Sequence, residues 1–216
     1  MLKGIRLIIY DLDGVLIDSN RAILESFRRT MAEIGEPFQP EAVLERLGLS
    51  LYQIFRELLP ASYHNKVEDL RQIYVKHFQS LDIDYIKLLP DVPETLAEMK
   101  RRGFMQSLAT NKTVTEAERI LIDLGVAGNF DLLVGFLSVK KPKPEPDMIL
   151  YTLERLGIDP LEAVLVDDTC VGLTAGLRAD VNTIGITTGN NTLEQLKTVE
   201  PTVIINGIRE LTRIIT

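Results

Sequence analysis

One stretch near the start of the chain, IRLIIYDLDGVL at residues 5–16, decides the fold. Residues 5–10 form a short and nearly continuous apolar run, which is typical of a strand buried in a parallel sheet. Asp11 follows this run directly, and Asp13 comes two residues later. Residues two apart on an extended chain point to the same side, so the two carboxylates converge just beyond the strand. Such a pair is either a solvated acidic turn or a site where a hard cation such as Mg²⁺ relieves the repulsion.

A long helical segment follows this first strand. From Asn20 to about Ile86 the apolar residues recur at helical spacing, and no strand-like run interrupts them. Gly35 ends the first stripe, as a glycine after a helix commonly does. The four apolar stripes lie at residues 23–34, 43–47, 51–58 and 67–81. They predict a small all-helical insert.

After Pro90 the pattern changes to an alternation of strands and helices. The predicted strands are Phe104–Thr110, Leu132–Val134, Ala163–Asp167, Asn182–Ile186 and Thr202–Ile205, each with a helical segment beside it. This alternation is typical of a parallel sheet covered by helices on both faces, and the first strand has to join that sheet across the insert. We therefore predict an α/β fold: a Rossmann-like, doubly wound parallel sheet core with an inserted all-helical cap. The core comprises residues 1–16 and 88–216, and the cap residues 17–87.

The composition restricts the class of protein. The chain has 216 residues, of which 45% are hydrophobic and 25% charged, as in a folded globular protein. A net charge of −7 disfavours nucleic acid as a partner, because duplex affinity comes mostly from neutralised phosphates. A single cysteine, Cys170, excludes an intrachain disulfide. The apolar run at residues 5–10 is too short to span a membrane and lacks the layout of a signal peptide. We therefore predict a cytoplasmic protein without a membrane partner; the sequence leaves its oligomeric state open.

A second acidic pair, Asp167 and Asp168, ends the predicted strand Ala163–Asp167. The carboxyl ends of parallel strands meet at one edge of the sheet, where ligands bind, so both acidic pairs are expected there. Thr110 and Asn111 end another strand and precede a capping box at residues 113–116. A hydroxyl beside a helix N-terminus makes either an anion site or an ordinary strand-to-helix turn.

Lysines occupy a proline-stiffened loop at residues 140–146, with the sequence KKPKPEP. Prolines limit the freedom of such a loop and can hold a cation in place. The alternative is a solvated basic loop. Both Lys141 and Lys143 precede a Pro-x-Pro segment, so either could be the cation that is held.

These four motifs, in this order, resemble the haloacid-dehalogenase-like superfamily over essentially the whole chain. Residues 11–16 match its first motif in full, and Thr110-Asn111 is similar to the second. Lys143 is similar to the third motif, with Lys141 as the second choice, and Asp167-Asp168 is similar to a paired-acid variant of the fourth. Many relatives instead carry the extra acid four residues after the motif aspartate, a place taken here by Gly172. The insert resembles the helical cap of the phosphoglycolate-phosphatase and beta-phosphoglucomutase branch.

The resemblance implies a phosphatase mechanism. Asp11 would attack phosphorus and form an aspartyl-phosphate, while Asp13 would protonate the leaving oxygen and later take a proton from water. Lys143 would act with them on the phosphoryl group. The implied Mg²⁺ ligands are Asp11, the Asp13 carbonyl and Asp168, with Asp167 in support. The implied phosphate-binding groups are Thr110, the backbone near Asn111, and Lys143.

Several related activities are less consistent with the sequence. Asp13 argues against halide displacement, since a halide leaving group needs no proton. The cap histidine and arginine of the mutase branch would fall at Ile23 and near Leu51, which are apolar, although Arg46 or Arg56 could take the place of that arginine. Residues 18–60 contain no lysine, which disfavours phosphonatase chemistry. His64 and His77 are taken as surface or core residues in preference to metal ligands.

The sequence therefore predicts a Mg²⁺-dependent phosphatase that is similar to phosphoglycolate phosphatase and acts on a small phosphorylated metabolite. Pyrophosphatase and beta-phosphoglucomutase-like phosphotransferase activities are the alternatives within the family. A catalytically silent binding or regulatory protein with the same fold is the alternative outside enzymes. The Leu47–Leu51 stretch is either a loop that contacts substrate or a plain connection between helices.

Overall fold

The core of the structure, a computed structural model that describes residues 1–81 and 83–216, is a six-stranded parallel sheet. Its strand order is β5-β4-β1-β6-β7-β8. The strands are β1 (Leu7–Tyr10), β4 (Met105–Thr110), β5 (Leu132–Gly135), β6 (Ala163–Asp167), β7 (Asn182–Ile186) and β8 (Val203–Ile205). Strand β1 lies between β4 and β6, with Tyr10 opposite both Leu108 and Val166. The first motif therefore leaves the sheet at its centre.

Helices cover both faces of this sheet. The side chains of Ile8 and Tyr10 pack with those of α5 (Val92–Arg101), α6 (Val114–Asp123) and α10 (Leu211–Ile214). On the opposite face, Leu7 and Ile9 pack with α7 (Asp147–Leu156) and α8 (Cys170–Arg178). Because β1 is covered on both sides, all four of its residues are buried, which explains its continuous apolar sequence. The predicted doubly wound α/β fold is confirmed.

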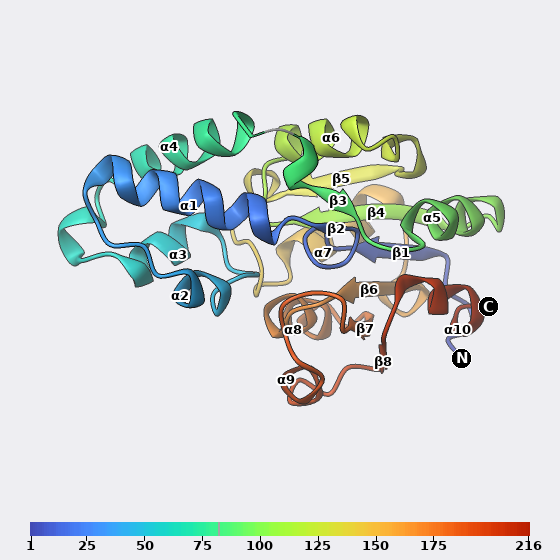
Figure 1. The fold of residues 1–216 in the computed structure, drawn as a ribbon. Helices are drawn as coiled ribbons and strands as arrows, with labels where there is room; N and C mark the ends of the chain where they lie inside the picture. Colours follow the sequence, from blue (N-terminus) through green and yellow to red (C-terminus); the bar gives the residue numbers. More distant parts are fainter. Residues whose placement is uncertain (82) are drawn as a thin grey trace.

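The predicted helical insert contains α1 (Asn20–Ile34), α2 (Pro40–Leu44), α3 (Leu51–Leu58) and α4 (Val67–Gln79). These helices extend from one end of the sheet, and both chain termini lie at the opposite end (Figure 1). Phe27, Phe55 and Tyr74 form the centre of the bundle, with ring centroids 4.8–6.4 Å apart. Gly35 ends α1 in the left-handed conformation, with φ of 74°. Residue 82, which falls within the predicted cap, lies outside the described residues.

Short elements complete the fold. Strand β2 (Ile17–Asp18) pairs antiparallel with β3 (Lys87–Leu88), where the chain leaves the core and returns to it. Helix α9 (Leu193–Lys197) follows β7 and precedes β8 along the chain. The 3-10 helices are Ala61–Tyr63, Ile83–Tyr85, Ala127–Asn129, Phe136–Ser138, Pro160–Glu162 and Ile208–Glu210. None of the helices in the described part of the chain is both long and apolar enough to cross a membrane.

Candidate active site

Three carboxylates meet at the carboxyl edge of the sheet. The Asp11 backbone extends the pairing of β1 with β6, since its N–H donates to the carbonyl of Val166 at 3.0 Å. Asp167 and Asp168 follow at the end of β6. One carboxylate oxygen from each of Asp11, Asp167 and Asp168 lies within 4.8 Å of the others. The parallel sheet thus brings together acids that are more than 150 positions apart in the sequence.

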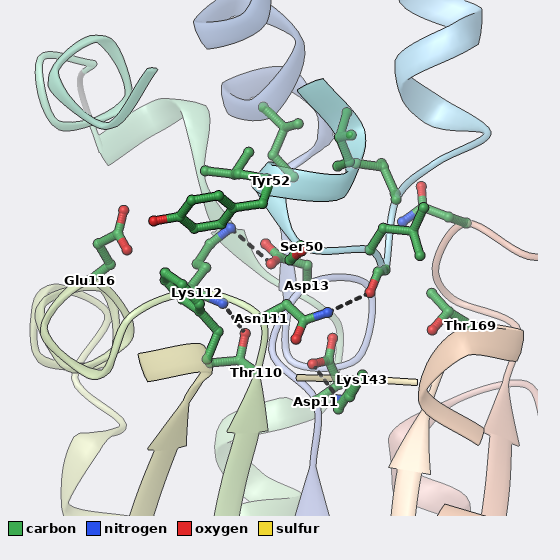
Figure 2. A pocket seen from close by; sticks show the side chains of 18 of the residues that line it. Asp11, Asp13, Ser50, Tyr52, Thr110, Asn111, Lys112, Glu116, Lys143 and Thr169 are labelled. Atoms are coloured by element: carbon green, nitrogen blue, oxygen red, sulfur yellow. Dashed lines mark hydrogen bonds and ion pairs between the residues drawn. The ribbon is translucent and has the colours of Figure 1, made fainter. Parts of the chain in front are cut away.

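Lys143 carries the positive charge of this cluster. Its Nζ lies 2.9 Å from Asp11 Oδ1 and 2.8 Å from Asp167 Oδ2, and the residue is only 2% exposed. Figure 2 shows its contact with Asp11. Lys141, the second choice from the sequence, is exposed. The structure therefore places Lys143, and not Lys141, among the acids.

Burial and charge crowding alter the protonation of these groups. Burial raises the pKa of Asp11 to about 7, with Lys143 acting in the opposite direction and Asp167 and Asp13 adding to the increase. Burial, together with the Asp167 and Asp11 charges, also raises the pKa of Asp168 well above its usual range. For Lys143, burial alone would lower the pKa, but Asp11 and Asp167 more than offset this, and its pKa is raised. One ammonium therefore compensates the three acids only in part, and a further cation would stabilise them.

The two acids at the end of β6, Asp167 and Asp168, have different surroundings. Both oxygens of Asp167 are occupied: Oδ2 accepts from Lys143, and Oδ1 accepts from the Thr169 backbone at 2.9 Å and its hydroxyl at 2.7 Å. Asp168 Oδ2 accepts from the Asn190 backbone at 2.7 Å, whereas its buried Oδ1 has no hydrogen-bond partner among the described residues. A buried, unpaired carboxylate oxygen is costly unless it binds a cation. The donor set therefore fits a hard metal ion, with Asp168 better placed than Asp167 to coordinate it.

Glycines leave the space that the acidic pair occupies. A Cβ added at Gly14 would lie 2.3 Å from Asp168 Oδ2, and one added at Gly189 would lie 1.9 Å from the same oxygen. A Cβ at Gly172 would lie 1.8 Å from Asp167 Oδ2. The carboxylate of Asp167 thus fills the space in which a side chain at position 172 would begin. Asp167 and a side chain at position 172 would therefore compete for the same space.

Asp13 lies on the side of the site that faces the insert. Its Oδ1 accepts a hydrogen bond from the hydroxyl of Ser19, and its Oδ2 lies 2.8 Å from Nζ of Lys112. Lys112 directly follows the second motif, yet its pairing with Asp13 was not predicted. That pairing depends on β1 and β4 being neighbours, because Asp13 follows one strand and Lys112 the other.

The second motif has two separate roles in the structure. Thr110 is buried at the end of β4, and its Oγ1 accepts from the Lys112 backbone at 3.2 Å. The Asn111 side chain points toward the insert and donates to the carbonyl of Gly48 at 2.7 Å (Figure 2). Thr113 then caps α6 by accepting from the Glu116 backbone. Thr110 and Asn111 both line the pocket, and the Asn111 side chain joins core to insert.

A pocket lined by residues of this site opens to solvent and reaches the insert. Its empty space, counted together with the solvent at its mouth, is about 900 Å³. Its lining from the insert is mainly apolar, with residues Ile23, Phe27, Leu47, Leu49, Leu51, Ile54, Tyr74 and Phe78 among its members. Ile23 and Leu51, the positions where the mutase branch would carry polar residues, therefore do face the site. Arg46 instead pairs with Glu57 at 3.0 Å, and Arg56 is exposed; neither contributes to this lining.

Lys112, Arg71 and Asn190 are among the residues of the site that were not predicted from the sequence. Lys112 and Arg71 line the pocket, and Asn190 lies in the loop after β7 with its backbone bound to Asp168. The rule that ligands bind beyond the carboxyl ends of strands could have drawn attention to the loop after β7. The predicted non-ligand histidines lie outside the lining: His64 Nε2 contacts the Arg56 carbonyl, and His77 pairs with Glu33.

Comparison with known proteins gives consistent matches. Residues 8–186 match the family described as haloacid dehalogenase-like hydrolase. A phosphoglycolate phosphatase from Aquifex aeolicus is 34% identical over 179 residues, covering 82% of this chain and 83% of the relative. The pyrophosphatase PpaX from Bacillus velezensis is 30% identical over 214 residues, covering 98% of this chain and 97% of the relative. The structure of a haloacid dehalogenase-like family hydrolase from Streptococcus pneumoniae has a TM-score of 0.86 at 24% identity, covering 97% and 98% of the two chains.

Proposed function

We propose that this chain, which belongs to the haloacid dehalogenase-like hydrolase family, is a Mg²⁺-dependent phosphatase that uses Asp11 as its nucleophile. The phosphatase class predicted from the sequence is confirmed by the family match and by relatives that are phosphatases. The proposal rests above all on the ion pair between Lys143 and Asp11, beside the unpaired oxygen of Asp168. A positioned carboxylate, a fixed cation and an open metal ligand are what phosphoryl transfer requires.

In the proposed reaction, a carboxylate oxygen of Asp11 forms a bond to phosphorus while the bond from phosphorus to the leaving oxygen breaks. Asp13 gives its proton to that oxygen. In the second step Asp13 takes a proton from water, the water oxygen bonds to phosphorus, and the bond to Asp11 breaks. Free phosphate leaves, Asp11 is again a free carboxylate, and Asp13 is again protonated. The position of Asp13 on the insert side supports this role, since a leaving group would lie there.

The other residues of the site would bind the metal ion and the phosphoryl oxygens. Asp11, the Asp13 carbonyl and Asp168 would hold Mg²⁺, which when bound neutralises charge on the phosphoryl oxygens. Asp167 supports the site by binding Lys143, since both of its own oxygens are already hydrogen-bonded. Lys143, the Thr110 hydroxyl and the backbone near Asn111, just before α6, would bind the phosphoryl oxygens.

The insert would take part in selecting the substrate. We propose residues 17–87 as a cap over the core formed by residues 1–16 and 88–216, because the pocket is lined by both. The apolar Ile23 and Leu51 offer no group to hold the second phosphate of a sugar bisphosphate, which favours hydrolysis over mutase transfer. Small phosphorylated metabolites, with phosphoglycolate and pyrophosphate as candidates from the named relatives, are the proposed substrates. The cytoplasmic location stays a prediction.

Hydrolysis of p-nitrophenyl phosphate with and without Mg²⁺ tests this function. We expect phosphate release with Mg²⁺ and its suppression by EDTA. A panel of phosphorylated metabolites, including phosphoglycolate and pyrophosphate, follows in the same assay. If wild-type protein releases phosphate from none of these compounds, the silent binding protein becomes the better description. Turnover that does not respond to EDTA would overturn the metal assignment alone.

A further inference from the structure

The side chain of Lys112 stands between the catalytic acids and the apolar pocket. Its Nζ lies 2.8 Å from Asp13 Oδ2 and 5.0 Å from the centre of the Phe78 ring, which belongs to the insert. The side chain is 15% exposed. Figure 2 shows it reaching up from the end of β4 to Asp13, beneath Tyr52. Its ammonium is therefore held at the boundary between the phosphoryl site and the space beyond it.

The two other cations in the pocket lining have carboxylate partners other than Asp13, the proposed acid for the leaving group. Lys143 bridges Asp11 and Asp167 below the phosphoryl site. Arg71 is bound by Glu68 through two parallel contacts, at 2.9 Å and 3.1 Å. Lys112 differs from both, because its carboxylate partner is Asp13, the group that has to contact the leaving oxygen. Among the described cations of this lining, Lys112 is thus the one beside the leaving group.

The distances limit how far a leaving group can be from this ammonium. Under the proposed function, Asp13 lies within one hydrogen bond of the leaving oxygen, and Lys112 lies within one hydrogen bond of Asp13. A group attached within a few bonds of the leaving oxygen can therefore reach Lys112. A largely buried ammonium favours an anion over a neutral group, because burial weakens its contact with water.

Much of the pocket lining that the insert contributes is apolar, and two of its polar members, Tyr52 and Arg71, are already bound to Glu68, so this space suits polyhydroxylated substrates poorly. Its lining from the insert includes Ile23, Phe27, Leu51 and Ile54, whose side chains cannot form hydrogen bonds. A sugar hydroxyl placed against these residues would lose its bonds to water without replacement. A short anionic leaving group avoids this cost, since its charge is met by Lys112 and little of it extends to the apolar wall.

We propose that Lys112 is a specificity residue that binds a second anionic group on the leaving side of the substrate. The substrate class is thus short phosphorylated compounds with a carboxylate or a second phosphoryl group within a few bonds of the leaving oxygen. This inference rests on the proposed phosphatase function and narrows its substrates. The carboxylate and the second phosphoryl group share the chemistry that Lys112 recognises, and separate substrates distinguish them.

The test compares matched substrates in the Lys112→Gln and Lys112→Arg variants. Phosphoglycolate is paired with 2-hydroxyethyl phosphate, which lacks the carboxylate, and pyrophosphate is paired with methyl phosphate. The readout is kcat/KM for the anionic substrate divided by kcat/KM for its neutral partner. Intrinsic reactivity cancels when this ratio is compared between wild type and variant. We expect Lys112→Gln to lower the ratio about 10- to 100-fold for at least one pair, the effect of one charge-assisted hydrogen bond. Lys112→Arg keeps the positive charge, so its ratio should stay close to that of wild type.

Lys141→Gln is the matched control, because it removes a lysine charge from an exposed position outside the pocket lining. For Lys141→Gln, the ratio of kcat/KM for the anionic substrate to kcat/KM for its neutral partner should equal that of wild type. Lys112→Gln could instead lower kcat/KM equally for both substrates of every pair. In that case Lys112 only positions Asp13 and the specificity proposal is wrong, while the phosphatase function stands. If wild type itself prefers the neutral partners, the proposed substrate class is wrong. If wild type hydrolyses none of the compounds, the phosphatase proposal fails together with it.

Discussion

The Nζ of Lys143 lies 2.9 Å from Oδ1 of Asp11, although 132 positions separate the two residues in the chain. Asp11 arrives at the centre of the sheet on β1, and Lys143 arrives on the loop that precedes α7. The same ammonium also contacts Asp167 at 2.8 Å, so it joins the ends of two adjacent strands. It reduces the repulsion of the acidic cluster and holds the proposed nucleophile in one orientation.

Replacement of Asp11 by Asn should abolish turnover while leaving the fold intact. The amide is nearly the same size as the carboxylate but lacks its charge and is a poor nucleophile towards phosphorus. Initial rates of p-nitrophenyl phosphate hydrolysis with Mg²⁺, together with circular dichroism and a thermal melt, check both parts. Activity close to that of wild type in a correctly folded Asp11→Asn protein would show that another group attacks phosphorus.

Replacement of Lys143 by Met should affect both activity and stability. Without its ammonium, buried carboxylates lose their compensating charge, and breaking such a buried pair costs about 3–5 kcal/mol. Urea unfolding in EDTA measures the free energy of unfolding, and phosphate release measures activity. Lys141→Met is the control, with an expected change within about 0.5 kcal/mol for an exposed position. Equal effects of the two substitutions would contradict the assignment of Lys143.

The metal assignment predicts different behaviour for Asp167, which ends β6, and Asp168, which follows it. Asp168→Asn should remove a direct Mg²⁺ ligand, whereas Asp167→Asn should weaken binding indirectly, by about 10- to 100-fold for a supporting residue. Calorimetric titration with Mg²⁺ gives the affinities, and the rise in melting temperature with added Mg²⁺ gives an independent value. We expect the larger loss for Asp168→Asn. A reversed order would make Asp167 the direct ligand.

Gly172→Ala should destabilise the protein, although alanine is the better helix former. In an open helical position this change would stabilise by up to about 1 kcal/mol. Here the new Cβ would lie 1.8 Å from Asp167 Oδ2, so the carboxylate has to move, and overpacking of this kind costs about 1–3 kcal/mol. Gly128→Ala is the control, because a Cβ there meets nothing within 4 Å. Chemical denaturation of both variants, with activity measured in parallel, distinguishes these outcomes.

Sequence patterns predicted the sheet well because its strands are buried on both faces. The predicted strands Ala163–Asp167 and Asn182–Ile186 coincide with β6 and β7, and Phe104–Thr110 differs from β4 by one residue. Strands β2 and β3 were missed, because two residues are too few to show a periodic pattern. Helix α9, with five residues, carried an equally weak signal.

The site was predictable where a motif ends a strand and not where side chains meet across elements. Asp11, Asp13 and Lys143 could be proposed from local sequence and the family resemblance. The ion pair of Lys112 with Asp13 depends on the order of strands and on side-chain directions, which spacing along one chain does not encode. The same holds for Arg71, whose distance from the motifs in the sequence gives no sign that it faces the pocket.

The pairing of β2 with β3 has a consequence for how this protein can change. Ile17 lies opposite Leu88 and Asp18 opposite Lys87, so the chain leaves the core and re-enters it one strand spacing apart. A segment with adjacent ends can lengthen, shorten or be exchanged as a block without moving the strands that carry the acids. Divergence within the insert can therefore alter the accepted leaving group while the chemical step is inherited unchanged.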